Sequence, residues 1–178
     1  MKNVLVVVDM QNDFTYGALK NAEAVAVIPA VKAKVEKAIS EGREVIYTQD
    51  THEADYLKTH EGRCLPVEHC IARTKGWEIV PELRREEMTV VTKPAFGSFD
   101  LIKKIAESDP ESIELVGVCT DICVISNALI LRAAFPEADI TVDAGCCAGV
   151  TPKAHDTALD AMGACHIEVT GRGEEAWR

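Results

Sequence analysis

The chain has 178 residues, of which 47% are hydrophobic, and this size and composition predict a single globular domain over residues 1–178 with a sizeable core. Its formal net charge of -10 at pH 7 would be repelled by nucleic acid and by anionic membrane surfaces, so we expect neither as a partner. A small-molecule substrate is the better expectation.

The sequence also bears on the cellular location. It has no signal-peptide pattern before the strand-like residues 4–8 and no apolar run long enough to span a membrane, so we expect a cytoplasmic protein. Its 7 cysteines are an odd number in a chain large enough to fold without disulfides, and we expect most of them to be reduced.

The first predicted element is a buried parallel strand at Val4–Val8, a continuous run of apolar, mostly β-branched residues. The run stops at Asp9, which therefore lies at the carboxyl end of a strand. A helix is predicted over Pro29–Ser40, since apolar residues recur at helical spacing between a proline suited to a first turn and the following Gly42. A second strand at Glu44–Asp50 completes a βαβ unit and also ends in an acid.

A loop of about twenty residues follows this strand and is rich in side chains that bind metals. His52, His60 and His69 occur in it together with several carboxylates. Neutral imidazole and carboxylate groups suit zinc, iron or manganese, and an Asp-x-His pair in an extended segment can direct both side chains toward one point. The loop therefore predicts a divalent metal site, with solvated loop residues as the alternative for any single side chain.

The rest of the chain continues the alternation of strands and helices. The predicted strands are Met88–Lys93, Glu114–Val118, Ala138–Asp143 and His166–Thr170, and the predicted helices are Ile79–Arg85, Asp100–Ser108, Val124–Ala134 and Pro152–Gly163. Gly171–Arg178 is a polar tail to which no structure is assigned. Six strands alternating with helices predict an α/β fold of three αβα layers around a doubly wound, mostly parallel sheet.

Candidate functional residues gather at one edge of this predicted sheet, because ligands bind beyond the carboxyl ends of the strands in doubly wound folds. The residues at or just past such ends are Asp9, Asp50, Lys93 and Cys123. Cys123 lies at a turn between a strand and a helix, where the positive end of the helix dipole is expected to lower the thiol pKa and make the sulfur a nucleophile. Burial as a small apolar side chain is the alternative for a free cysteine.

Three motifs at these positions resemble those of one enzyme family. They are Val-Asp-x-Gln-Asn-Asp-Phe from Val8, Lys-Pro-Ala-Phe-Gly-Ser-Phe from Lys93, and Gly-Val-x-Thr-Asp-x-Cys-Val from Gly117. Together they resemble the isochorismatase-like cysteine hydrolases, the family that includes nicotinamidase and pyrazinamidase. The resemblance extends over nearly the whole chain, with Gly97 in place of the serine that is usual in the second motif.

The resemblance implies a catalytic triad in which Cys123 is the nucleophile, Asp9 the acid and base, and Lys93 the third catalytic residue. It also implies that the backbone amides of Cys119 and Cys123 receive the oxyanion, after a cis peptide bond between Val118 and Cys119. A pocket for the substrate is expected to be lined by aromatic residues. The candidates are Phe14, by the resemblance, and Phe96 and Phe99, for which packing in the core is the alternative.

The same resemblance implies metal ligands in the loop after the second strand. The residues that match the family pattern are Asp50, His52 and His69. The segment from Pro66 to His69 has one residue more than the usual Pro-x-His. We favour Glu61 over His60 as the fourth ligand. The expected cofactor is a divalent metal, with zinc first and iron or manganese as alternatives.

By this resemblance the expected reaction is deamidation of nicotinamide to nicotinate and ammonia through a cysteine thioester, as part of NAD salvage, and we also expect a homo-oligomer. Alternatives within the family are a metal-free hydrolase of another small amide, carbamoyl or ureido compound, and a vinyl-ether hydrolase. A protein of a different class, for thiol redox or metal storage, is the alternative suggested by the cysteines and loop histidines.

Overall fold

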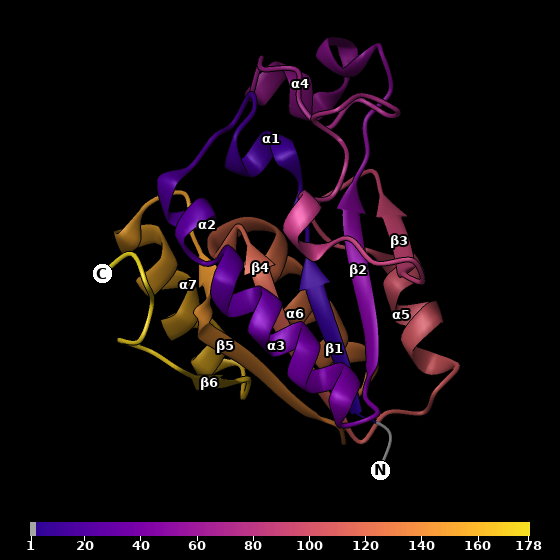
Figure 1. Ribbon diagram of the computed structural model, residues 1–178, viewed down its shortest axis with the longest axis vertical. Helices are drawn as coiled ribbons and strands as arrows, with labels where there is room; N and C mark the ends of the chain where they lie inside the picture. The colour runs from indigo at the N-terminus through magenta and orange to yellow at the C-terminus, as the bar shows by residue number, and fades with distance from the viewer. Residues whose placement is uncertain (1–2) are drawn as a thin grey trace.

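The computed structural model describes residues 3–178 and shows one parallel sheet between two layers of helices (Figure 1). The strands are β1 (Asn3–Val8), β2 (Glu44–Asp50), β3 (Thr89–Lys93), β4 (Ser112–Val118), β5 (Asp139–Ala148) and β6 (Glu168–Thr170). They lie in the order β3-β2-β1-β4-β5-β6, and every neighbouring pair is parallel. The predicted doubly wound α/β fold is confirmed.

Helices cover both faces of the sheet because the central strands are apolar on both sides. In β1, Leu5 and Val7 belong to the core on one face, and the alternate valines belong to the core on the other. The first face is covered by α2 (Ala22–Ala26) and α3 (Ile28–Ser40), and the second by α5 (Phe99–Ala106), α6 (Ile125–Ala134) and α7 (Pro152–Ala164). Among residues 3–178, no helix combines the length and the hydrophobicity that crossing a membrane requires.

Short elements lie beyond the carboxyl ends of the strands (Figure 1). They are α1 (Asn12–Thr15), a 3₁₀ turn at Tyr56–Lys58, α4 (His60–Cys64) and a π-helical turn at Thr120–Val124. The loop that follows β2 is therefore partly helical and closes over the edge of the sheet where the functional residues were predicted.

Two predicted boundaries differ most from the structure. The helix predicted over residues 79–85 is only a 3₁₀ turn at Pro81–Leu83, because the residue before a proline is pushed out of the helical region, and Val80 accordingly has φ -54° and ψ 140°. Strand β5 continues to Ala148 instead of ending at Asp143, across an irregular register with β4.

The strand order reverses between β1 and β4, which are neighbours in the middle of the sheet. Connections leave these two strands in opposite directions, so a crevice forms at their carboxyl ends. Gly117 of β4 pairs with Val8 of β1 and has a φ of +113°. A Cβ at Gly117 would lie 2.2 Å from the carbonyl oxygen of Val8, so only glycine allows the two strands to approach at this point.

A pair of Gly→Ala variants tests this close approach. We expect Gly117→Ala to destabilise the fold by about 3 kcal/mol or more, since it combines a backbone clash with a left-handed conformation. Gly163→Ala in α7 meets nothing within 4 Å and should stabilise by roughly 0.5–1 kcal/mol. Urea unfolding of both variants gives the comparison, and a Gly117→Ala protein as stable as the wild type would contradict the analysis.

Candidate active site

Three strand ends bring Asp9, Lys93 and Cys123 together. Asp9 follows β1, Lys93 is the last residue of β3, and Cys123 lies in the π-helical turn after β4. The Lys93 Nζ lies 2.7 Å from Asp9 Oδ2 and 3.5 Å from Cys123 Sγ. All three side chains are buried, so the contacts form away from bulk water.

Asp9 is held in place by a residue that the sequence did not single out. Thr48 of β2 donates its hydroxyl to Asp9 Oδ1 at 2.6 Å, and the Asp9 amide donates to the same hydroxyl oxygen at 3.2 Å. Asp9 has a positive φ of 47°, a conformation that aspartate tolerates better than most residues. The turn after β1 therefore directs the carboxylate toward Lys93.

The charges of the triad shift the pKa of each member. Burial raises the pKa of Asp9, against the opposing charge of Lys93. Burial alone would lower the pKa of Lys93, but the neighbouring Asp9, Cys123 and Asp50 raise it well above its ordinary value. The lysine is therefore a permanent ammonium at neutral pH.

The expectation that the Cys123 thiol has a lowered pKa is wrong. Burial and the nearby Asp9 carboxylate raise the pKa of this thiol well above its ordinary value, in spite of Lys93. The helix α6 begins only at Ile125, after the π-helical turn, so the thiol does not lie at a regular helix N-terminus. In the resting site the sulfur is protonated and can lose its proton only to a neighbouring base.

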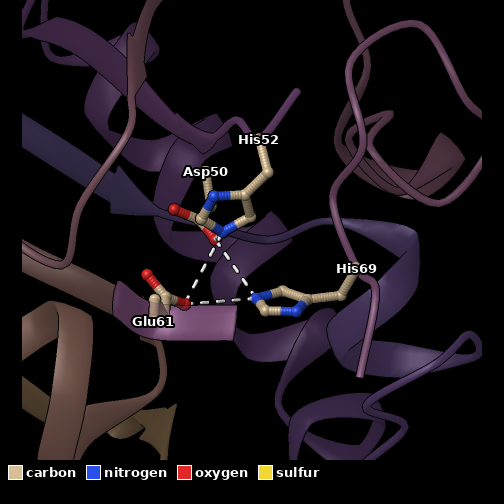
Figure 2. A group of neighbouring side chains, drawn as sticks. All are labelled: Asp50, His52, Glu61 and His69. Carbon is tan, nitrogen blue, oxygen red and sulfur yellow. Dashed lines mark ion pairs between the residues drawn. The ribbon is translucent and has the colours of Figure 1, made fainter. Parts of the chain in front are cut away.

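Asp50, His52, Glu61 and His69 form a second cluster, shown in Figure 2. Their ligand atoms all lie within 4.8 Å of one another. Asp50 Oδ2 is 3.1 Å from His52 Nε2, and Glu61 Oε1 is 3.6 Å from the Nε2 atoms of both histidines. All four predicted ligands are thus brought together.

The atoms of this cluster fit a divalent cation. His69 Nδ1 lies 2.8 Å from the carbonyl oxygen of Val67, which places the proton on Nδ1 and leaves Nε2 as a free acceptor that faces the cluster. The buried His52 Nε2 has no hydrogen-bond partner. Two imidazole nitrogens and two carboxylate oxygens around one point, without a thiolate, are a donor set for zinc, iron or manganese.

Two details of the predicted ligand set are now clear in the structure. Despite the additional residue after Pro66, His69 faces the other ligands. Glu61 rather than His60 belongs to the cluster, although both lie on α4. The His60 Nε2 instead lies 3.7 Å from Cys64 Sγ, in an exposed position.

Asp50 connects the two clusters. Its Oδ1 lies 3.1 Å from the Lys93 Nζ, while its Oδ2 faces the histidines. Burial alone would raise the pKa of Asp50, but the neighbouring imidazoles of His52 and His69 and the charge of Lys93 lower it. Gln11, which sequence reasoning passed over, fixes the Asp50 backbone by accepting from its amide at 2.7 Å and donating to its carbonyl at 2.9 Å.

A cavity of about 570 Å³ opens onto both clusters. Phe14 and Phe96 line it, together with Cys119 and Cys123. Cys123 lies in the π-helical turn Thr120–Val124, which we call the nucleophile turn, and Cys119 directly precedes it. Phe99 does not line the cavity: this residue begins α5 and is 77% exposed, so the structure does not bring it to the site. Apolar residues without any sequence signal also line the cavity, namely Leu19, Leu65, Ile122 and Val150, and so do the polar residues Lys20, Asn21 and Glu23.

The peptide bond between Val118 and Cys119 is cis, as the sequence motif led us to expect. It lies between β4 and the π-helical turn, and Cys119 and Cys123 both line the cavity. Their backbone amides are thus the candidates for an oxyanion site.

Three similar proteins have known structures. Pyrazinamidase of Pyrococcus horikoshii, crystallised in complex with zinc, is 28% identical with a TM-score of 0.85, and the match covers 96% of this chain and 99% of that chain. Nicotinamidase/pyrazinamidase PncA from Bacillus subtilis is 26% identical with a TM-score of 0.85, over 96% of this chain and all of that chain (100%). N-carbamoylsarcosine amidase from Thermoplasma acidophilum is 26% identical with a TM-score of 0.79, over 100% and 98% of the two chains.

Sequence comparison gives the family directly. The Bacillus subtilis (strain 168) protein described as an uncharacterized isochorismatase family protein PncA is 30% identical over 143 residues, which are 72% of this chain and 78% of that protein. The model of the isochorismatase domain matches residues 3–174, which include every residue of both clusters. The chain therefore belongs to the isochorismatase family.

Proposed function

We propose that this protein is an amidohydrolase that converts nicotinamide to nicotinate and ammonia through a thioester on Cys123, as a step of NAD salvage in the cytoplasm. The observation that carries the proposal is the buried Lys93 ammonium, which contacts Asp9, Asp50 and Cys123 and so joins a nucleophile and its base to a set of metal ligands at one cavity. Similarity to nicotinamidase/pyrazinamidase PncA and to the zinc complex of pyrazinamidase supports it.

In the first half of the proposed reaction, Cys123 Sγ bonds to the amide carbon while its proton moves to the Asp9 carboxylate. Because burial raises the pKa of Asp9, this carboxyl can hold the proton and then give it to the leaving nitrogen. The carbon–nitrogen bond breaks, ammonia leaves, and a thioester remains. Lys93 offsets the negative charge that Asp9 and the sulfur share during the transfer.

In the second half, Asp9 takes a proton from water while the water oxygen bonds to the thioester carbon. The carbon–sulfur bond then breaks, Asp9 returns the proton to Cys123 Sγ, and nicotinate is released. In both halves a negative charge develops on the former carbonyl oxygen, and we expect the backbone amides of Cys119 and Cys123, two residues that line the cavity, to receive it.

A divalent ion held by Asp50, His52, Glu61 and His69 would supply a Lewis acid that binds the pyridine nitrogen of the substrate. The chain's own residues orient the ring from the side. Phe14 lines the cavity and lies edge-on to the His69 ring, with 5.8 Å between ring centroids. Phe96 provides a second aromatic wall. The pyridine ring thus has both apolar contacts and one polar anchor.

A second candidate is hydrolysis of a carbamoyl compound by the same triad. The cavity of about 570 Å³ is large enough for substrates beyond a single ring, and the similarity to N-carbamoylsarcosine amidase extends over the full chain. A thiol redox role has less support, since no two cysteines of the sequence are spaced as Cys-x-x-Cys.

The nucleophile is tested by Cys123→Ala. We expect turnover to fall by roughly a thousandfold or more, because the variant cannot form the thioester, while the fold is retained. The exposed Cys165 serves as a matched control, and Cys165→Ser should keep wild-type turnover. Ammonia release from nicotinamide measures both, and an active Cys123→Ala protein would rule out the thioester mechanism.

The metal ligands are tested by two histidine variants from the same loop. His52→Ala removes a buried ligand and should lose most of the bound zinc, whereas His60→Ala removes an exposed ring outside the cluster and should keep it. Metal content of the purified proteins, measured by mass spectrometry after zinc loading, is independent of any activity assay. Equal metal content in both variants would contradict the ligand assignment.

The substrate class is tested by comparing ammonia release from nicotinamide with that from N-carbamoylsarcosine. We expect the zinc-loaded protein to cleave nicotinamide with the higher kcat/KM, since only nicotinamide has a ring nitrogen that can bind the metal ion. Removal of the metal with a chelator should reduce cleavage of nicotinamide. A protein that cleaves only the carbamoyl compound, with or without metal, would establish the second candidate instead.

A further inference from the structure

The end of the chain folds back against β5 and α7. We refer to residues 171–178 as the C-terminal tail. Its Trp177 donates from Nε1 to the carbonyl oxygen of Cys147 in β5 at 3.2 Å. The same ring meets His155 of α7 in a T-shaped contact, with 5.0 Å between centroids and an interplanar angle of 87°. The tail is thus attached to β5 and α7, both of which come after the nucleophile turn in the chain.

His155 connects the tail to the nucleophile turn. Its Nδ1 lies 2.8 Å from the hydroxyl oxygen of Thr120, the first residue of the turn, and its Nε2 lies 3.2 Å from Glu175 Oε1 in the tail. The relative exposure of Thr120 and His155 is 0%, and that of Glu175 is 4%. A continuous buried hydrogen-bonded path therefore runs from the end of the chain to the residue that follows Cys119.

The direction of these hydrogen bonds follows from the chemistry of the partners. Burial lowers the pKa of His155, against the opposing effect of Glu175, so the imidazole is neutral and has one proton. A carboxylate only accepts, so that proton lies on Nε2 and is donated to Glu175. Nδ1 is then an acceptor, and the Thr120 hydroxyl donates to it. By fixing the proton of His155 on Nε2, Glu175 leaves Nδ1 free to accept the hydrogen bond from Thr120.

Glu175 is itself fixed by the tail. Its Oε2 accepts from the Gly173 amide at 2.8 Å, and the Arg178 guanidinium contacts both of its carboxylate oxygens. Arg178 also binds Asp156 of α7 at 2.5 Å and lies over the Trp177 ring, 4.9 Å from its centroid. These contacts explain how a carboxylate remains ionised in a buried position, and they lower its pKa.

Thr120, His155 and Glu175 have the residue types of a hydrolytic triad, but their position gives them another role. Thr120 is fully buried and does not line the cavity, so no substrate reaches its hydroxyl. The neighbouring Asp121 supports a holding role, because its Oδ1 accepts from the Val150 amide at 2.9 Å and makes a second link from the turn to the segment before α7. Two consecutive residues between Cys119 and Cys123 are thus fastened to the same part of the chain.

We propose that the C-terminal tail is a positioning element for the nucleophile turn. Glu175 fixes the tautomer of His155, His155 holds the Thr120 hydroxyl, and this bond sets the path of the backbone from Cys119 to Cys123. The inference rests on the proposed role of Cys123 as the nucleophile. Because both candidate oxyanion amides and the reacting sulfur lie on this short turn or directly before it, a small displacement affects them together.

The test is a double-mutant cycle on Thr120 and Glu175. Thr120→Val removes the hydroxyl at nearly constant size and should reduce kcat roughly 10- to 100-fold with little change in KM, whereas Thr120→Ser should restore kcat. Glu175→Gln should reduce kcat by a smaller factor, since its amide oxygen still accepts from Nε2. The double variant should be no slower than Thr120→Val, because both changes act through His155.

A second measurement keeps this test separate from the proposed substrate. Alkylation of Cys123 by iodoacetamide, followed on its peptide by mass spectrometry, should become several-fold faster in Thr120→Val as the buried thiol gains access. This measurement works even for a protein that does not cleave nicotinamide. Urea unfolding identifies any variant that fails to fold, in which case Glu175→Gln alone carries the test.

Glu174→Gln is the matched control, since Glu174 is the adjacent tail carboxylate but is exposed. It should leave kcat and the alkylation rate of Cys123 at wild-type values. Folded Thr120 and Glu175 variants with wild-type kcat and alkylation rates would overturn the proposal. So would losses in kcat that multiply in the double variant, because the two residues would then act independently.

Discussion

The buried ammonium of Lys93 is the interaction on which the site depends. An unpaired ammonium in a protein interior is very unfavourable, so Lys93 requires anionic neighbours at short range. Asp9 at 2.7 Å and Asp50 at 3.1 Å meet this need, and the carbonyl oxygen of Ala95 accepts a further hydrogen bond at 3.0 Å. Because these partners come from β1, β2 and the turn after β3, the lysine ties three strand ends to one point.

Lys93 also contributes to the net charge of the whole site. Asp9, Asp50 and Glu61 can contribute three negative charges and Lys93 one positive charge, while the two histidines are neutral as ligands. A divalent cation among the four ligand atoms would bring the sum to zero, and low-dielectric surroundings favour such a balance. Electrostatics thus favours the metal site independently of the ligand distances.

The sequence was sufficient to predict the sheet and most of the site, because both follow from where apolar runs end. Asp9, Asp50 and Lys93 were predicted together since each ends or follows a strand, and parallel strands share one edge. The sequence was not sufficient for properties that depend on tertiary contacts, such as a pKa, a supporting hydrogen bond or the exposure of a side chain. The raised pKa of Cys123 results from burial beside Asp9. The hydrogen bonds from Thr48 to Asp9 and between Gln11 and Asp50 join segments that are distant in the sequence. Phe99 is exposed to solvent although it belongs to the same motif as Phe96.

Strand β3 lies at one edge of the sheet, with a neighbour on one side only. Edge strands open at a lower free energy than the central strands, because fewer hydrogen bonds and less apolar contact hold them. Lys93 is the final residue of this strand, and alternate residues before it are exposed. Partial opening of β3 would therefore separate the ammonium from its two carboxylates while the rest of the sheet remains intact. The local stability of one short strand, rather than the global stability of the protein, then limits the lifetime of the assembled site.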